Sequence, residues 1–234
     1  MNEQKIFASP EDELLRYKDN LRSGLLQYTR RAFHLLPHIA SPYILDIGCG
    51  SGVPTMELAR LSHGKITAID IDQAQLDKLF IIAKQAGLLE HINILKCSIL
   101  NMDFKEESFD IIWAEGSIAV IGFKRGLTEW RRFLKTGGFL VVHDDMEHLN
   151  EKIRNISQCG YDLLEQFTLN NNIWWDEYFA PLENKLREIR KKYPYDQALN
   201  VILDHEQREI DRISKYPDRN SSVFLVMKKQ PIHV

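Results

Sequence analysis

The sequence has few cysteines and no long apolar run. Its three cysteines, Cys49, Cys97 and Cys159, are an odd number at wide spacings, and no two of them form a Cys-x-x-Cys pair. This pattern favours neither a disulfide framework nor a zinc or thioredoxin-like motif. No apolar run approaches the ~18 residues of a membrane-spanning helix, so we expect no membrane association. The sequence begins with polar and acidic residues, which favours a cytoplasmic location.

An excess of positive charge is also missing. The 30 Lys and Arg residues are balanced by 33 Asp and Glu residues, for a formal net charge of −3. Binding to a nucleic-acid backbone requires a basic surface, so we expect no nucleic-acid partner. The chain has 234 residues, of which 44% are hydrophobic and 27% charged. These values are typical of a globular protein with a full core.

The apolar pattern alternates between short strands and amphipathic helices over the middle of the chain. The predicted strands are 43–47, 65–70, 92–97, 109–113, 139–143 and 161–169, with a last strand at 222–227. Strands that alternate with helices form right-handed βαβ units. The sequence therefore predicts an α/β fold, with a doubly wound and mostly parallel sheet.

Two helical segments flank this pattern. Residues 1–40 form a predicted N-terminal helical segment, and residues 170–219 form a helical insertion before the last strand. A stretch of that length is too long for a plain loop in a compact domain. We expect a single domain over 1–234, whose sheet core is 41–169 and 220–230. The apolar faces of the insertion make a homodimer possible.

A glycine-rich turn follows the first predicted strand. It contains Asp46, Gly48, Gly50 and Gly52. Ligands of open α/β sheets bind at the carboxyl ends of the strands, and glycines let them approach the backbone. The dinucleotide pattern Gly-x-Gly-x-x-Gly fails here, because its third glycine is Val53. Asp46 favours a cationic ligand group over a diphosphate. An NAD(P)-dependent oxidoreductase is thus a less favoured alternative.

A second carboxylate, Asp70, ends the second predicted strand. At this place a carboxylate can accept hydrogen bonds from both hydroxyls of a ribose. The alternative is that Asp70 is only a turn or cap residue. The joint presence of the glycine turn and Asp70 favours a ligand that carries a ribose.

Four segments together resemble the class I S-adenosylmethionine-dependent methyltransferases. They are LDIGCGSG, AIDID, FDIIWAEG and LKTGGFLVV, which follow one another in the expected order between residues 42 and 145. The segment GSIAVIGFKRGLTEWRRFLKTGGFLVV looks like a bacterial and archaeal branch of small-molecule type. The resemblance implies a seven-stranded Rossmann-like sheet with an antiparallel last strand. It also implies S-adenosyl-L-methionine as cofactor.

The resemblance assigns the cofactor-binding residues. The methionyl part would be held by the turn, the ribose by Asp70, and the adenine by Ile71 together with Ser98 and Ile99. Many members carry Asp where this chain has Ser98, and Ser is a neutral partner with a shorter reach. The turn residues are Asp46, Gly48, Cys49, Gly50 and Gly52.

Candidates for the acceptor side are Glu115, His143, Trp174 and Trp175. Glu115 ends the fourth predicted strand and could polarise or bind a substrate, or hold the cofactor or a loop instead. His143 ends the fifth strand and could be a general base or a strand-end residue bonded to backbone. The two tryptophans could form a substrate pocket or a packing seam. No metal site is predicted.

These features predict transfer of a methyl group from S-adenosylmethionine to an O, N, S or C atom of a small-molecule acceptor. Methyl transfer needs an aligned nucleophile and a dry site, and a base only if the nucleophile is protonated. A non-catalytic S-adenosylmethionine-binding protein is the main alternative. A protein acceptor also stays open.

Overall fold

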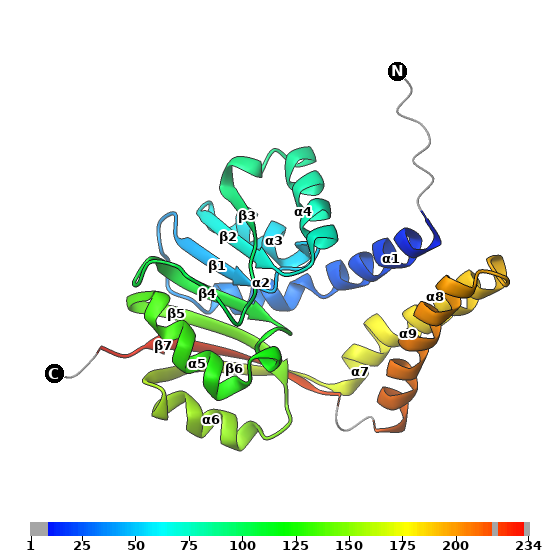
Figure 1. The fold of residues 1–234 in the computed structure, drawn as a ribbon. Helices are drawn as coiled ribbons and strands as arrows, with labels where there is room; N and C mark the ends of the chain where they lie inside the picture. The colour runs from blue at the N-terminus through cyan, green and yellow to red at the C-terminus, as the bar shows by residue number, and fades with distance from the viewer. Residues whose placement is uncertain (1–8, 217–219, 232–234) are drawn as a thin grey trace. The chain divides into compact units, whose positions relative to one another are not determined.

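The computed structural model describes residues 9–216 and 220–231, which fall into two compact units (Figure 1). One unit extends from Leu26 to Thr168 and takes in the last strand. The other combines the first helix, up to Leu25, with Leu169–Ser221. No helix among the described residues is both long and apolar enough to span a bilayer.

The larger unit is built on a seven-stranded sheet of order β3-β2-β1-β4-β5-β7-β6. Neighbours among the first five strands are parallel, and β7 runs antiparallel to β5. The predicted α/β class and the antiparallel last strand are therefore confirmed. The strands are β1 (Tyr43–Ile47), β2 (Lys65–Asp70), β3 (Ile92–Lys96), β4 (Phe109–Glu115), β5 (Leu134–Asp145), β6 (Tyr161–Leu169) and β7 (Ser222–Lys229).

Alternation along the strands gives the sheet two different faces. One face carries Leu45 and Ile112 in a cluster with buried residues of α5 and α6, such as Trp130 and Ile156. The helices of this unit are α2 (Leu26–His34), α3 (Val53–Ser62), α4 (Gln73–Gln85), α5 (Phe123–Trp130) and α6 (Leu149–Gln158), with short 3-10 turns η1 (Leu89–His91), η2 (Ile118–Val120) and η3 (Arg131–Phe133).

The polar site residues lie on the other face. Asp46 of β1 pairs in register with Trp113 of β4, so both side chains project on the side opposite to Leu45 and Ile112. The ring of Phe33 in α2 lies 6.5 Å from the Trp113 ring. Helix α2 therefore covers this face near the carboxyl end of β4.

The start of the fifth strand differs from the prediction. Helix α5 ends at Trp130 and continues as a 3-10 turn, and the fifth strand, predicted over 139–143, already begins at Leu134. Gly137 adopts φ +74°, and the pairing with β4 shifts register between Phe109 and Ile111. A glycine with positive φ accommodates such an irregularity, so the Gly-Gly segment lies inside the strand and not before it.

The smaller unit is helical. Its core consists of apolar residues from three helices: Leu14, Leu182, Leu186, Ile189, Leu199, Leu203 and Ile210. Glu13 pairs with Lys185 at 2.7 Å and with Lys192 at 2.9 Å, which fastens α1 to α8. The first part of the predicted N-terminal helical segment, α1, thus packs on the insertion. The elements are α1 (Pro10–Gly24), α7 (Asn171–Trp174), the π-helical turn η4 (Trp175–Phe179), α8 (Ala180–Lys192) and α9 (Gln197–Lys215).

Candidate functional site

The turn after β1 is fixed by its backbone and its neighbours. The N–H groups of Gly48 and Cys49 donate to the Ile69 carbonyl at 2.8 and 3.0 Å. A Cβ on Gly48 would lie 2.5 Å from the Ser117 Cβ, and a Cβ on Gly52 would lie 2.2 Å from the Leu79 Cδ1. Both glycines also have positive φ. The turn is therefore held tightly between the segment after β4 and helix α4.

Gly50 differs from the other two glycines. A Cβ built on it meets no atom within 4 Å, although its φ is +52°. Its N–H donates to the Asp70 Oδ2 at 2.8 Å, and the Asp72 N–H donates to the Asp70 Oδ1 at 2.9 Å. Asp72 itself caps α4 by accepting from the Ala74 N–H. The Asp70 carboxylate is thus fixed beside an open stretch of backbone, and each oxygen retains capacity for a further donor.

The remaining predicted adenine contacts lie at neighbouring strand ends. Ile71, next after Asp70, is 67% exposed, which is unusual for a large apolar side chain at a strand end. Ile99 packs partly against the core, and the Ser98 hydroxyl accepts from the Leu100 N–H at 3.3 Å. The exposed Ile71 offers an apolar surface of the kind that a planar base requires.

Asp46 is a buried carboxyl, only 3% exposed. It accepts a hydrogen bond from the Thr55 hydroxyl of α3 at 2.6 Å. Burial raises the pKa of Asp46 to about 7, and the charges of Glu115 and Asp70 add to this rise, while the Thr55 bond opposes it. Burial also raises the pKa of the Cys49 thiol, so this thiol stays neutral and does not act as a nucleophile.

The raised pKa of Asp46 predicts a pH-dependent affinity for a cationic ligand. The folded protein keeps the Asp46 proton up to a higher pH than the unfolded chain does. The contribution of Asp46 to the free energy of unfolding therefore falls as the pH rises from about 4 to about 7. A cationic ligand binds the ionised form, so its affinity rises mainly between about pH 6 and about pH 8. We expect S-adenosylmethionine to bind about tenfold more tightly at pH 8 than at pH 6.

The Asp46→Asn variant provides the control for this prediction. Its amide oxygen can still accept from Thr55, but no proton is released. We expect its affinity for S-adenosylmethionine to be nearly independent of pH, and its unliganded form to melt higher than the parent at pH 8. Titration calorimetry and thermal melts at both pH values measure this. An equally steep pH dependence in the variant would assign the effect to another group.

Glu115 lies at the carboxyl end of β4, beside His143 in the pairing of β4 with β5. Its Oε1 accepts from the Thr29 hydroxyl of α2 and from the Trp113 indole, both at 2.8 Å. Trp113 is fully buried and Thr29 is 2% exposed. The Glu115 carboxylate is therefore held by two buried donors on the face that carries Asp46.

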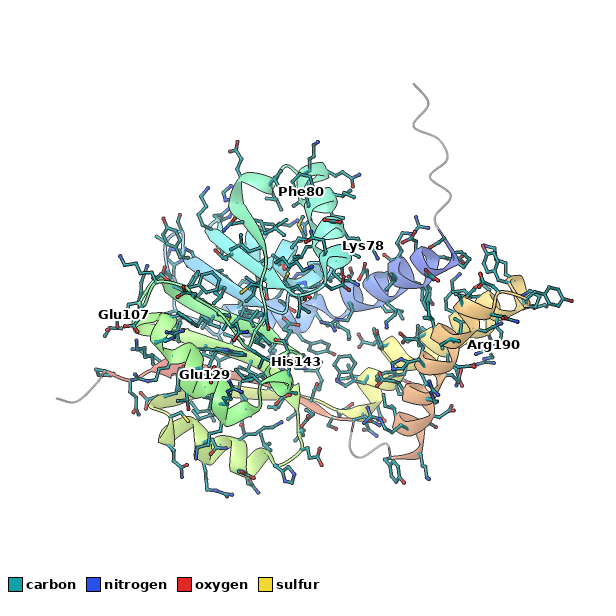
Figure 2. All side chains as sticks on the ribbon, viewed as in Figure 1. Lys78, Phe80, Glu107, Glu129, His143 and Arg190 are labelled. Atoms are coloured by element: carbon teal, nitrogen blue, oxygen red, sulfur yellow. The ribbon has the colours of Figure 1, made fainter. Side chains whose placement is uncertain are left out.

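His143 is packed against the last strand. Its Nε2 lies 2.7 Å from the Ser222 hydroxyl, and its ring stacks on Phe224 with centroids 4.2 Å apart. The side chain is 8% exposed. Figure 2 shows its position within the sheet. This geometry suits a residue that secures the end of β5 better than one that takes a proton from an acceptor.

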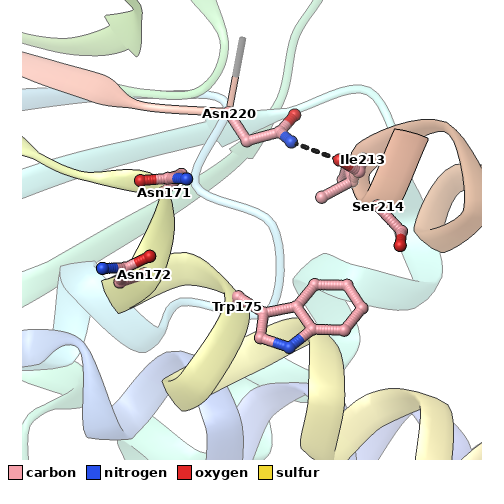
Figure 3. Close-up of a pocket in the computed structure, with 6 residues that line it drawn as sticks. All are labelled: Asn171, Asn172, Trp175, Ile213, Ser214 and Asn220. Carbon is pink, nitrogen blue, oxygen red and sulfur yellow. Dashed lines mark hydrogen bonds between the residues drawn. The ribbon is translucent and has the colours of Figure 1, made fainter. Parts of the chain in front are cut away.

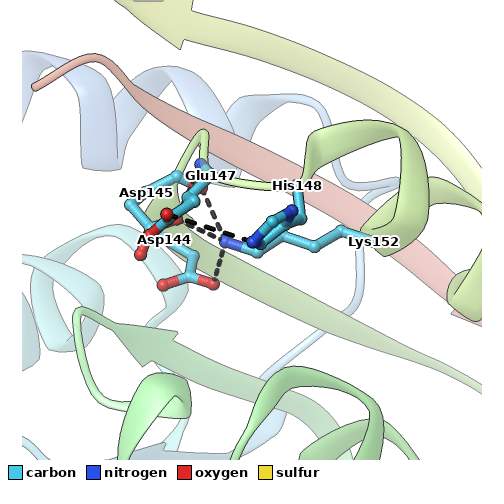
Figure 4. A network of polar contacts seen from close by, with 5 residues as sticks. All are labelled: Asp144, Asp145, Glu147, His148 and Lys152. Carbon is cyan, nitrogen blue, oxygen red and sulfur yellow. Dashed lines mark hydrogen bonds and ion pairs between the residues drawn. The ribbon is translucent and has the colours of Figure 1, made fainter. Parts of the chain in front are cut away.

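A buried lysine ties the end of β5 to α6 (Figure 4). Lys152 pairs with Asp144 and with Asp145, each at 2.7 Å, and also donates to the Asp145 carbonyl at 2.8 Å. All three ammonium protons thus have acceptors. The network fixes the last two residues of β5, which follow His143.

Trp174 and Trp175 belong to the helical unit. Trp175 lines a pocket of about 250 Å³ in which polar side chains predominate (Figure 3). Its other lining residues are Asn171, Asn172, Ile213, Ser214 and Asn220. The Trp174 ring instead contacts the rings of Tyr178 and Phe179, at 6.0 and 6.1 Å. The two neighbouring tryptophans therefore have different surroundings, one in a pocket and one in an aromatic cluster.

Four residues that contact the site were not predicted from the sequence. Thr55 bonds Asp46, Ser117 donates to the Ile47 carbonyl at 2.6 Å, and Thr29 and Trp113 hold Glu115. Thr55 lies in the first turn of the helix after the glycines, where a local signal could have found it. The others depend on long-range pairing that no local pattern shows.

The residues present fit S-adenosylmethionine. Gly50 has open space in front of it, Asp70 offers acceptors for ribose hydroxyls, and Ile71 offers an apolar surface. Glu115, and Asp46 when it is ionised, would supply negative charge toward the sulfonium and ammonium groups of such a ligand. Metal-ligand groupings are absent from residues 9–216 and 220–231.

Comparisons with known proteins agree with this fit. A family model described as a methyltransferase domain matches residues 44–138. Sterol 24-C-methyltransferase ERG6B of Gibberella zeae is 26% identical over 141 residues, which cover 56% of this chain and 37% of that protein. The sterol 24-C-methyltransferase of Debaryomyces hansenii is 28% identical over 210 residues, covering 81% and 54%. The chain thus spans about a third to a half of the length of these curated relatives.

Solved structures share the fold at low identity. A methyltransferase of Geobacter sulfurreducens in complex with S-adenosylhomocysteine superposes with a TM-score of 0.71 at 17% identity, covering 88% of this chain and 90% of that one. The [4+2]-cyclase SpnF superposes with a TM-score of 0.73 at 19% identity, covering 87% and 81%. Residues 44–138 thus match a methyltransferase domain model, and the chain shares the fold of S-adenosylmethionine-dependent methyltransferases.

Proposed function

We propose that the protein transfers a methyl group from S-adenosylmethionine to a small-molecule acceptor. The observation that carries this proposal is the pairing of the open Gly50 backbone with the fixed Asp70 carboxylate. It is supported by the methyltransferase family match over the same residues. The sterol methyltransferase relatives and a geranyl diphosphate C-methyltransferase neighbour suggest a small-molecule acceptor.

Methyl transfer from a sulfonium depends on the alignment of donor and acceptor more than on acid-base catalysis. S-adenosylmethionine supplies the methyl group and its own leaving group when bound. In this chain the glycine turn and Asp70 hold the donor, and Asp46 and Glu115 face it with negative charge. Helix α2 covers the same face, which helps to exclude water. We assign Glu115 to binding and orienting the acceptor, through a hydroxyl, an amine or a cationic group.

The charge of the site favours some acceptors over others. Glu115 and Asp70 both act electrostatically on Asp46 at one edge of the sheet. An anionic acceptor would approach this edge against repulsion, whereas a neutral or cationic acceptor would not. We therefore favour amines, alcohols or apolar acceptors over diphosphates and carboxylates.

The first experiment is a titration of S-adenosylmethionine, S-adenosylhomocysteine and NAD into the protein. Binding of the first two and not of NAD is the expected result. Pooled amines, phenols and thiols are then incubated with S-adenosylmethionine, and S-adenosylhomocysteine is quantified. Binding without turnover on any pool would favour a non-catalytic or cyclase-type role, as in SpnF. Binding of NAD alone would overturn the assignment.

We also infer three broader properties. The near-neutral charge balance favours no nucleic-acid partner, and the three widely spaced cysteines favour the reducing cytoplasm. The exposed Val201 and Ile202 on α9, at 67% and 37%, support a homodimer. Sedimentation of a monomer at high concentration would contradict the dimer.

A further inference from the structure

Thr29 makes an unusual contact for a threonine inside a helix. Helical threonines commonly bond a carbonyl of the preceding turn. The Thr29 hydroxyl instead lies 2.8 Å from the Glu115 Oε1, on a strand that is far away in the sequence. Thr29 is 2% exposed, and the Glu115 side chain that it contacts is half-buried.

Two contacts of neighbouring residues fix the position of helix α2 close to Thr29. Arg30 pairs with the buried Glu57 of α3, and Phe33 packs near the Trp113 ring. Phe33 lies one turn beyond Thr29 on the same side of the helix, whereas the adjacent Arg30 points to a different side and reaches α3. The position of the hydroxyl is therefore set by contacts to both α3 and β4.

The two hydrogen bonds to Glu115 fix a single oxygen atom. An indole N–H can only donate, so the Oε1 must be an acceptor for Trp113. A second donor on the same oxygen restricts rotation of the carboxylate. Charge-assisted hydrogen bonds of this kind are about twice as strong as neutral ones. Loss of either donor would leave the carboxylate charged but less well oriented.

We propose that Thr29 is a positioning residue that, with the Trp113 indole, orients the Glu115 carboxylate toward the methyl donor and its acceptor. This inference rests on the proposed function. It assigns to α2 a part in the reaction that goes beyond covering the site. The hydroxyl acts through Glu115 and does not itself contact the reacting atoms.

The first test observes the hydrogen bond directly. In ¹⁵N-tryptophan-labelled protein, the indole signal of Trp113 is assigned by its loss in Trp113→Phe. We expect Thr29→Val to shift this signal and Thr29→Ser to restore it. The buried Trp130 indole, for which the structure shows no acceptor, provides an internal reference that should not move. An unmoved Trp113 signal in Thr29→Val would overturn the proposal.

The second test measures whether the orientation of the Glu115 carboxylate affects the binding of the methyl donor. The affinity of S-adenosylmethionine, which carries a sulfonium, is divided by that of the neutral S-adenosylhomocysteine. We expect Thr29→Val to lower this ratio about three- to tenfold, and Thr29→Ser to stay within twofold. In a Glu115→Gln background the same Thr29→Val change should have no further effect on the ratio.

The matched control is Thr128→Val, an equivalent change on the exposed side of α5. It should change neither the ratio nor the Trp113 signal. A ratio that is unchanged in Thr29→Val while both ligands bind would contradict the role of Thr29 alone. Failure of the parent protein to bind either ligand would instead contradict the proposed function.

Discussion

Replacing Asp70 by alanine is expected to lower the affinity for S-adenosylmethionine and S-adenosylhomocysteine about a hundredfold or more. The variant loses the acceptors for the ribose hydroxyls. It also releases the Gly50 N–H, which Asp70 holds at 2.8 Å. Both ligands carry the ribose, so both should lose affinity to the same extent. Titration calorimetry on the two ligands measures this.

Asp72→Ala provides the control for this change. Its carboxylate caps α4 at the Ala74 N–H, so its loss should cost about 1 kcal/mol of stability. We expect its cofactor affinity to stay near that of the parent. If the Asp70 and Asp72 variants lose affinity equally, the effect comes from damage to the strand end and not from a lost ribose contact.

Replacing Gly50 by alanine should separate binding from folding. The added Cβ meets no protein atom within 4 Å, so only the positive φ of +52° opposes it, at a cost of about 1–2 kcal/mol. The same methyl group would occupy the space that we assign to the cofactor. We expect a folded variant with at least a tenfold loss of S-adenosylmethionine affinity. Calorimetry together with a thermal melt gives both values.

Gly48→Ala is the contrasting variant. Its Cβ would lie 2.5 Å from the Ser117 Cβ, so the turn or the segment after β4 must move. Overpacking of this kind costs about 1–3 kcal/mol, in addition to the strain of its positive φ. We expect a clear fall in melting temperature. Full cofactor affinity in Gly50→Ala would show that the ligand does not approach this part of the turn.

The sheet and its cofactor edge could be predicted because their signals are local. The apolar run of β1, the glycines after it and the acid at the end of β2 occur within short segments. The family resemblance added the antiparallel β7, which periodicity alone cannot orient. Asp72 could be predicted as a helix cap for the same reason, since a cap acts within one turn.

The surroundings of Glu115 could not be predicted in this way. Thr29 and Glu115 meet only after α2 and β4 have packed together, and neither segment carries a pattern that specifies the other. The burial of Asp46 likewise depends on the whole sheet. The division of the N-terminal segment is a further example. Only packing shows that α1 joins the insertion while α2 joins the sheet unit.

The division into two units determines which segments must be exchanged together in a chimera with a related protein. The chain passes between the two units three times, next to Leu25, Leu169 and Ser221. Leu14 of α1 belongs to the same core as Leu186 and Leu203, and Glu13 carries two of its ion pairs. A graft of residues 169–221 alone would leave this core incomplete. The unit to be exchanged therefore consists of two separate segments, and a chimera should carry α1 together with residues 169–221.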